Sequence, residues 1–294
     1  MEARLAEPNS LVNLGELARP ATVLIEKVSD AIGGVFEPWQ IRRVAEAQAE
    51  ANMTLAVAGV EISELQHRSI HRMMIEEARK QLNIETITAA ALPMLDPESD
   101  PSAIEDDWIA NFFEKCRLIS DQDMQALWSR VLAGEANAPG SYSKRTVNFL
   151  GSLDKGDAQL FASLCRFSLD GGQLPLVYDH NAGVYKDHGL QFSSLKHLDS
   201  IGLISFGSSS YRLEDRPKRI SIVLYGNRYE IEFVNDDGND FKIGRVMLTQ
   251  VGRELAALCS PEPVPGFEDY LADQWVRAGY VVATRLQDHG LGGA

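Results

Sequence analysis

The stretch from Ser120 to Thr146, SDQDMQALWSRVLAGEANAPGSYSKRT, decides how the first half of the chain folds. Its glycines, hydroxyls and basic pair are the ingredients of a phosphate-binding loop. A Walker loop needs a glycine, four residues and then Gly-Lys-Ser/Thr, and that order does not occur here. We therefore interpret the stretch mainly as the bend between two helices.

The residues of this bend each have an expected conformational role. Ser120 with Asp123 fits a helix-start pattern, and Gly134 is placed to end the helix that follows in a left-handed turn. Ser141 or Ser143 can then cap the next helix, KRTVNFLGSL. On this interpretation the bend handles no substrate.

Lys144 and Arg145 are the candidate anion contacts of the region. They stand at the expected start of a helix, where free backbone N–H groups can hold an anion. We favour a simple bend and keep an anion site at these two residues as the alternative.

Upstream, Pro38 is well placed to open a long helix, which we expect to run from about Trp39 to about Lys80. Its apolar residues recur at steps of three and four, the period of a coiled-coil seam. The helix either packs within its own bundle, which we favour, or pairs with a second subunit. A separate helix, NIETITAAALPML, is expected to stop near Pro93. The seam residues are Ile41, Val44, Ala51, Leu55, Ala58, Ile62 and Leu65.

His67 and His71 lie four residues apart on the long helix, a spacing at which two imidazoles can share a metal ion. HRSIH lacks the glutamate that follows the first histidine of a zincin motif. We favour a solvated helix face and expect no metal and no other cofactor.

Residues 10–36 show helical spacing that Pro20 interrupts, which predicts two short helices. A membrane-surface helix usually carries a basic polar face, whereas the charges here are mixed. We favour helices docked on the core, with membrane insertion as the alternative.

The composition indicates a folded, acidic protein. The chain has 294 residues, 45% of them apolar, and a net charge of −14. An acidic protein is repelled by nucleic acid and anionic membranes at long range. Three scattered cysteines argue against a disulfide framework and favour a reducing, cytoplasmic setting. The sequence contains no apolar run of membrane-spanning length and no secretory signal at its start.

Several segments together carry a family resemblance: RKQLNIETI, DDWIANFFEKC, ISDQDMQALWSRVLAGE and PGSYSKRT. They resemble an uncharacterised bacterial domain family of unknown function, which is more loosely similar to the abortive-infection alpha proteins of bacteria. The resemblance covers about residues 38–164, and its W-x-x-x-L-A-G-E core followed by P-G-x-x-S is its most specific mark. It implies a bacterial helical protein with a link to phage defence, and it transfers no catalytic residue.

The last third of the chain changes in character. The segment LQFSSLKHLDSIGLISFGSSSYRLED predicts a helix closed by Gly202, then a strand, a Gly-Ser turn and a return strand. This order resembles the recognition helix and wing of a winged-helix domain. RISIVLYGNRYEIEFV adds a strand pair with Gly226-Asn227 as its turn, and Thr249 can cap a closing helix.

Many winged-helix domains bind DNA, so we consider whether this part of the chain does. A DNA-binding surface needs cations at phosphates and polar groups on the helix in the major groove. Acids interrupt the basic residues here, so we favour protein contact or packing and keep DNA binding as an alternative. The candidate nucleic-acid contacts are Lys196, His197, Arg212, Arg216, Lys218, Arg219 and Arg228.

Catalysis is the weaker expectation. Cys165 with His180 or His188 is a formal nucleophile–base pair. Nothing beside these residues marks a strained nucleophile turn or an oxyanion loop. We therefore name no catalytic residue and lean toward a protein that is not an enzyme.

The sequence thus predicts a mainly α N-terminal helical domain plus an α+β winged-helix-like C-terminal domain. The expected divisions are residues 1–37, 38–153, 154–260 and 261–294. The first functional hypothesis is a non-enzymatic interaction or scaffold protein with a protein partner or self-association. The alternatives are a DNA-binding regulator acting through the wing and a membrane-acting effector.

Overall fold

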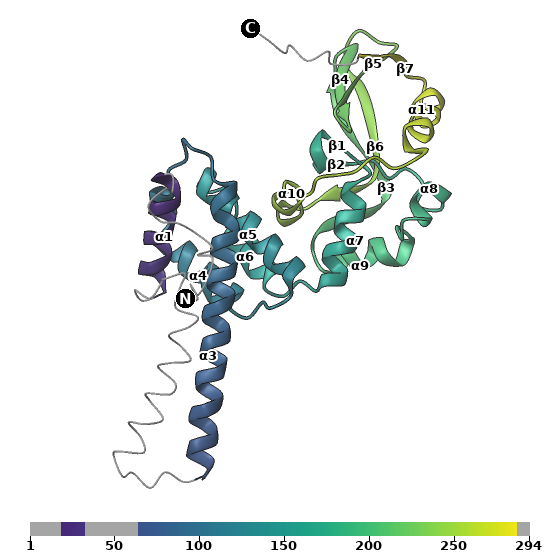
Figure 1. The fold of residues 1–294 in the computed structure, drawn as a ribbon. Helices are drawn as coiled ribbons and strands as arrows, with labels where there is room; N and C mark the ends of the chain where they lie inside the picture. Colours follow the sequence, from purple (N-terminus) through teal and green to yellow (C-terminus); the bar gives the residue numbers. More distant parts are fainter. Residues whose placement is uncertain (1–18, 33–63, 287–294) are drawn as a thin grey trace, which may run out of the picture. The chain divides into compact units, whose positions relative to one another are not determined.

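The computed structural model describes residues 19–32 and 64–286. The chain divides into two compact units, residues 1–151 and 152–294. The first unit is built from helices, and the second combines helices with small antiparallel sheets (Figure 1). At this coarse level the expected mixture of α and α+β structure is confirmed.

The first unit has a tightly packed aromatic centre between two of its helices. Trp108 stacks on Phe112 at 5.1 Å between ring centroids, and Phe112 meets Trp128 edge to face at 5.0 Å. Pairs of this kind stabilise a fold by about 0.5–1.5 kcal/mol beyond the burial of their area. In chain order the elements are α1 (Arg19–Ala31), α3 (Glu64–Ala91), η2 (Leu92–Met94), η3 (Pro101–Ala103), α4 (Asp106–Cys116), α5 (Gln122–Asn137) and α6 (Lys144–Leu150).

Helix α1 is docked on the core of the first unit. It buries Leu24 and Val28 completely, and it packs on α4 and η3. Lys27 donates to Ile104 O at 2.9 Å and pairs with Asp106 at 2.5 Å. Pro20 lies in the first turn of α1, where a missing N–H costs nothing. Helix α1 therefore corresponds to the second of the two predicted helices, and the first lies outside the described residues.

Helix α3 corrects the predicted helix boundary near Lys80. It runs without interruption from Glu64 to Ala91, so the two predicted helices are one across this region. Asn83, the first residue of the second predicted helix, donates to Arg117 O at 2.9 Å and to Ser120 Oγ at 3.1 Å. Its side chain therefore does not compete with the helix backbone. The expected stop near Pro93 is confirmed.

The second unit contains three antiparallel strand groups and five helices among its described residues. The pairs are β1–β2 and β3–β6, and the third group has the order β4–β5–β7. In chain order the elements are α7 (Lys155–Cys165), β1 (Ser168–Leu169), η4 (Asp170–Gly172), β2 (Leu174–Pro175), α8 (Gly183–Lys186), α9 (Phe192–Ser200), β3 (Ile204–Arg216), β4 (Arg219–Leu224), β5 (Asn227–Glu232), β6 (Asn239–Leu248), α10 (Gln250–Ala256), α11 (Phe267–Arg277) and β7 (Val281–Leu286).

The predicted Gly-Ser turn after α9 is wrong. Strand β3 continues through Gly207 to Arg216 and pairs with β6, which lies far along the chain. The register jumps from Phe206↔Val246 to Tyr211↔Gly244, so the Gly-Ser run forms a bulge within one strand. Ser205 Oγ and Tyr211 OH lie 2.9 Å apart across this bulge.

The turn between β4 and β5 lies one residue earlier than predicted. Leu224 pairs with Asn227, which leaves Tyr225 and Gly226 as the two-residue loop. Both have positive φ, 51° and 77°, as a type I′ turn requires. A tyrosine in this conformation needs support, and its hydroxyl donates to Arg166 O at 2.6 Å and accepts from Val264 N at 3.2 Å.

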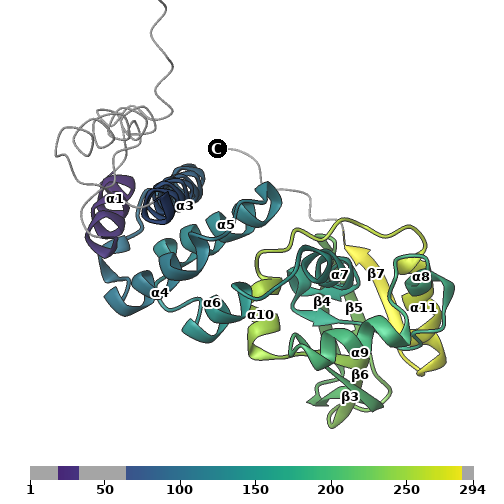
Figure 2. The same ribbon diagram turned by 90° about the horizontal axis from the view of Figure 1, so that it is seen from below.

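The C-terminal elements close the second unit. The predicted Thr249 cap is confirmed, since its hydroxyl accepts from Gly252 N at 3.0 Å. Helix α11 lies beside α8 (Figure 2), with Phe267 buried and the Tyr185 and Tyr270 rings 5.4 Å apart. Strand β7 pairs with β5.

Candidate functional site

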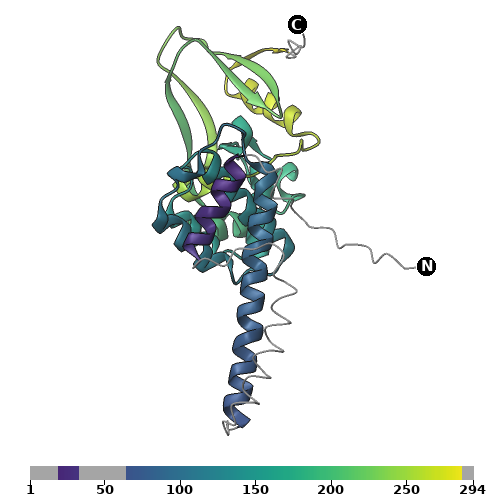
Figure 3. The ribbon, with the colours of Figure 1, turned by 60° about the vertical axis from the view of Figure 1, so that its left-hand side comes forward.

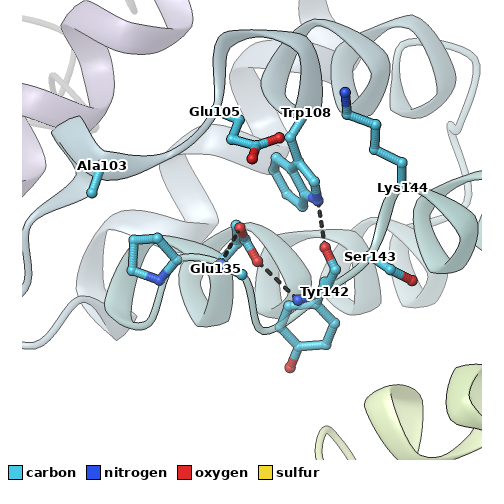
Figure 4. A pocket seen from close by; sticks show the side chains of 9 residues that line it. Ala103, Glu105, Trp108, Glu135, Tyr142, Ser143 and Lys144 are labelled. Carbon is cyan, nitrogen blue, oxygen red and sulfur yellow. Dashed lines mark hydrogen bonds between the residues drawn. The ribbon is translucent and has the colours of Figure 1, made fainter.

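The loop of residues 138–143, which carries the P-G-x-x-S part of the family mark, is held by a buried carboxylate. Glu135 is 3% exposed. Its Oε1 accepts from Gly140 N at 2.7 Å and its Oε2 from Tyr142 N at 2.9 Å (Figure 4). A buried carboxylate must be hydrogen-bonded to be tolerated, and here both oxygens bind backbone of the loop.

Two further signature residues fix Tyr142. Trp108 Nε1 donates to Tyr142 O at 2.6 Å (Figure 4). Gly134 lies under the tyrosine ring, because a Cβ there would stand 2.7 Å from Tyr142 Cε2. The prediction that Gly134 ends the helix is therefore wrong. Helix α5 continues to Asn137, and the glycine makes room for a ring.

The remaining residues of the bend shape the backbone. Gly140 has φ 90°, a conformation that favours glycine. Ser143 caps α6 by accepting from Thr146 N at 3.3 Å, so of the two predicted caps Ser143 is the one used. At the start of α5 the cap is Asp121, and Ser120 bonds to Asn83 instead.

A cavity of about 470 Å³ opens beside this loop and is lined in part by Glu105, Trp108, Glu135 and Lys144 (Figure 4). Three polar side chains of its wall are already engaged. Glu135 and Trp108 hold the loop, and Lys144 Nζ lies 3.4 Å from Asp107 Oδ2. Arg145, the other predicted anion contact, is exposed and does not line the cavity. The three engaged side chains of the cavity wall thus hold the loop in place or pair with Asp107 rather than point free groups at a ligand.

The contacts of Cys165, His180 and His188 give no support to the formal nucleophile–base pair, for which we name no catalytic residue. His188 Nδ1 lies 3.1 Å from Val184 O and its ring packs on Phe167. His180 packs on aromatic rings. The Cys165 thiol is buried, and its hydrogen bond with Cys259, together with burial, raises its pKa well above the usual value. A thiol of raised pKa is mostly protonated, so Cys165 lacks the activated thiolate that a catalytic nucleophile needs.

His67 and His71, whose spacing would allow a shared metal ion, are exposed on α3. Across residues 19–32 and 64–286, the side chains form no group of three or more histidines, cysteines or acids that could hold a metal ion.

The candidate nucleic-acid contacts lie mostly beside acids. The hydrogen bond to Asp236 raises the pKa of Lys218, and the Lys196 ammonium lowers the pKa of Asp199. Arg216 Nε donates to the Glu214 carbonyl, and Arg228 lies on β5 opposite Val223. The ion pairs are Lys196–Asp199 at 2.6 Å, Arg212–Asp240 at 2.8 Å, Lys218–Asp236 at 2.8 Å and Arg219–Glu232 at 3.2 Å. His197 Nε2 lies 2.7 Å from Asp157 Oδ1.

These pairs affect DNA binding through the electrostatic potential at the surface rather than through the stability that they add. Exposed ion pairs contribute about 0–1 kcal/mol each, so they do not lock the side chains. Each acid nevertheless cancels the charge that a phosphate would meet. Sequence reasoning noticed Glu214 and Asp215 but missed Asp157, Asp236 and Asp240, which the fold brings in from elsewhere.

The fold and the loop define the class of this protein: a helical unit with a carboxylate-clamped loop, followed by a small α+β unit. The chain belongs to the DUF2806 family, described as a protein of unknown function, whose family model matches residues 67–272. The match begins later than the predicted resemblance at residues 38–164 and extends much further, across both units. No curated protein and no solved structure matches the chain.

Within residues 19–32 and 64–286, no helix combines the length and the apolar character needed to cross a bilayer.

Proposed function

We propose that this chain is a non-enzymatic interaction protein that self-associates through the N-terminal part of α3. The observation that carries the proposal is the exposure of apolar side chains along residues 64–82, which we name the α3 arm. Buried residues of α3 begin at Asn83, and the arm extends beyond the other helices of its unit (Figure 3).

The apolar residues of the arm are unusually exposed. Leu65 is 66% exposed, Met73 57%, Ile75 51% and Leu82 43%. They are four of the ten large apolar side chains found exposed among the described residues. Exposed apolar groups gathered on one element favour a protein contact, whereas single ones need no explanation.

The partner that we propose is a second copy of the chain, which is the second of the two interpretations of the long helix. The seam of alternating three- and four-residue steps is typical of helix pairing, and it reaches the arm at Leu65. The other six seam residues, from Ile41 to Ile62, lie outside the described residues. The arm carries both signs of charge, including Glu64, Arg68 and Arg72, as suits a surface that pairs with itself.

For the second unit we propose a winged-helix-like module whose wing differs from the predicted one. The order of α7, α8 and α9 followed by the β3–β6 pair supports this. The bridge between Val177 and Gly244 adds a third chain segment to that pair. In this arrangement the β4–β5 hairpin is an insertion between the two wing strands.

We propose that this module serves protein contact or packing rather than DNA. The acids beside its cations and the net charge of −14 support that choice. The link to phage defence rests on the family resemblance and on no contact in the structure. Membrane insertion gains no support from α1, whose apolar face is buried in its own unit.

The test is the solution mass of the full chain and of two matched variants. Leu65→Glu with Met73→Glu places charges on the arm, where both side chains are exposed and the fold has little to lose. Val234→Glu with Val276→Glu changes equally exposed positions of the second unit. By light scattering, we expect a mass above that of the 32.5 kDa monomer for the wild type and the control.

The arm variant is expected to have the monomer mass. A wild type that stays monomeric at high concentration contradicts self-association. An arm variant with the same mass as the wild type contradicts the assignment of the surface.

A further inference from the structure

Two cysteines that are far apart in the sequence meet in the second unit. Cys165 is the last residue of α7, and Cys259 follows the end of α10. A Cβ placed on Gly172 would lie 3.7 Å from Cys165 Cβ and 3.3 Å from Ala256 O. Cys259 N donates to that same carbonyl at 3.0 Å.

The polypeptide around the two cysteines is held together by other contacts. Arg166, directly after Cys165, donates from Nε to Glu262 O and from Nη2 to Pro263 O, both at 3.3 Å. Gln173 Nε2 donates to Arg253 O at 3.3 Å. The end of α7 and the segment after α10 are therefore neighbours whatever the state of the sulfurs. Cys259 Sγ lies 3.9 Å from Leu255 O, and the Cys259 side chain is near enough to Cys165 to raise the pKa of the Cys165 thiol.

The two thiols differ in access to solvent. Cys165 is fully buried, whereas Cys259 is half-buried. The third cysteine, Cys116, is fully buried in the first unit. An oxidant from solution therefore reaches Cys259 first, and the nearest second thiol is Cys165.

We propose that Cys165 and Cys259 form a reversible disulfide when the protein meets hydrogen peroxide. The Cys259 thiolate attacks one peroxide oxygen, the O–O bond breaks, and the sulfur becomes a sulfenic acid as hydroxide leaves. The Cys165 sulfur then attacks the Cys259 sulfur. The S–S bond forms, the S–O bond breaks, and the hydroxyl leaves as water with the Cys165 proton. Overall two thiols are oxidised and one peroxide is reduced to two waters.

The bond would tie down the connection to the C-terminal elements. Residues 259–266 lead from Cys259 to α11, whose Phe267 packs on Phe167 at 4.9 Å between centroids. A link at Cys259 therefore restrains the chain just before it joins this aromatic contact. A disulfide that closes a long loop also removes freedom from the unfolded chain, so the oxidised second unit should melt at a higher temperature.

The test counts free thiols in the full chain before and after treatment with hydrogen peroxide, then after dithiothreitol. The reduced protein has three free thiols. We expect one to remain after oxidation and three to return after reduction. Intact mass should fall by two hydrogens, and a peptide map without reductant should join the Cys165 and Cys259 peptides. The melting temperature of the wild type should rise on oxidation and fall back on reduction.

Two variants separate the pair from general oxidation. Cys116→Ser should still lose two thiols to the same linked peptide. Cys259→Ser changes a half-buried residue, so folding is retained, and it should form no link and show no rise in melting temperature. Cys259 that gains two or three oxygens without a link overturns the proposal, as does a link that involves Cys116.

Discussion

Glu135 shows how a family signature can be structural rather than chemical. An acid within the LAGE segment of the family mark invites a catalytic role, yet both of its oxygens hold loop N–H groups. Trp108 and Gly134 act on the same loop through Tyr142. The Glu135 carboxylate accepts hydrogen bonds from the loop, the Trp108 indole donates one to it, and Gly134 has no side chain that would collide with the Tyr142 ring.

Replacing Glu135 tests this role. Glu135→Gln replaces one carboxylate oxygen by an amide NH₂. Gly140 N–H or Tyr142 N–H then faces a donor instead of an acceptor, inside a buried site. We expect a loss of about 2 kcal/mol in the free energy of unfolding, measured by urea denaturation. Glu105→Gln, on the exposed rim of the same cavity, is the control and should change it little. Equal effects of both would contradict the clamp.

Gly134 offers a second test at this scale. Gly134→Ala gains helix propensity of up to about 1 kcal/mol but forces the new Cβ against the Tyr142 ring. We expect net destabilisation in the wild type and stabilisation in a Tyr142→Ala background, a coupling that a double-mutant cycle measures. Gly156→Ala, with nothing within 4 Å of its Cβ, should show no such coupling. Additive effects for Gly134 would show that the ring contact costs nothing.

Local residue roles were predictable where the signal is local. The caps at Ser143 and Thr249 are predictable because a hydroxyl just before a helix can accept from one of its first backbone N–H groups. Both caps are confirmed. Gly134 could not be assigned from sequence, because its reason is a ring eight residues away in a folded loop. The meeting of Cys165 and Cys259 depends on tertiary contacts and has no local signal.

At the scale of elements, α3 is held to α5 by a buried polar network. Asn83 accepts from Gln125 Nε2 at 3.1 Å and donates to Ser120 Oγ. Thr88 donates back to Ile84 O. Such groups fix the register of two helices because a shifted pairing would leave them unsatisfied.

Glu85 makes the stability of this helix depend on pH. Burial raises its pKa above the usual 4.5, although the bond from Gln81 acts in the opposite direction. The folded state therefore binds a proton more tightly than the unfolded state, and stability falls as pH rises from about 4.5 through the raised value. Glu85→Gln should remove this part of the slope in urea denaturation series.

A matched control for Glu85 is Glu98→Gln, in an exposed loop. We expect this variant to keep the wild-type dependence on pH. If Glu85→Gln and the wild type lose stability in parallel over that range, Glu85 is not the group responsible.

The strand pairing of the second unit shows where element-scale prediction reaches its limit. The strand positions and the hairpin of β4 and β5 follow from alternation and turn residues. The partner of β3 does not, because Gly207 to Ser210 has the composition of a turn and forms a bulge instead. The true partner, β6, lies beyond an inserted hairpin, and a pairing so distant leaves no local pattern.

At the scale of the molecule, charge argues against a DNA-binding role. We expect a labelled duplex to show no binding to the full chain even at about 50 mM salt, where phosphate contacts are strongest. Asp236→Asn with Asp240→Asn, which frees two cations of the second unit, should create weak, salt-sensitive binding. Affinity of the wild type that falls steeply with salt would contradict this account.

The overall architecture was predictable in outline and the functional surface only in part. Helical spacing and the change in character after residue 153 indicate a helical unit followed by an α+β unit. The match to DUF2806 supports the family-level resemblance. The neutralised cations could not be foreseen, because Asp157 and Asp240 approach the basic residues through folding rather than through sequence.

The account depends most on the α3 arm as a contact surface, and hydrogen exchange measured against protein concentration tests it directly. Amides of a helix that projects from its unit exchange quickly unless they are covered. We predict that residues 64–82 become protected as concentration rises, while amides of α4 keep constant exchange rates. Exchange in the arm that does not change with concentration, in a protein whose mass stays that of one chain, would contradict the account.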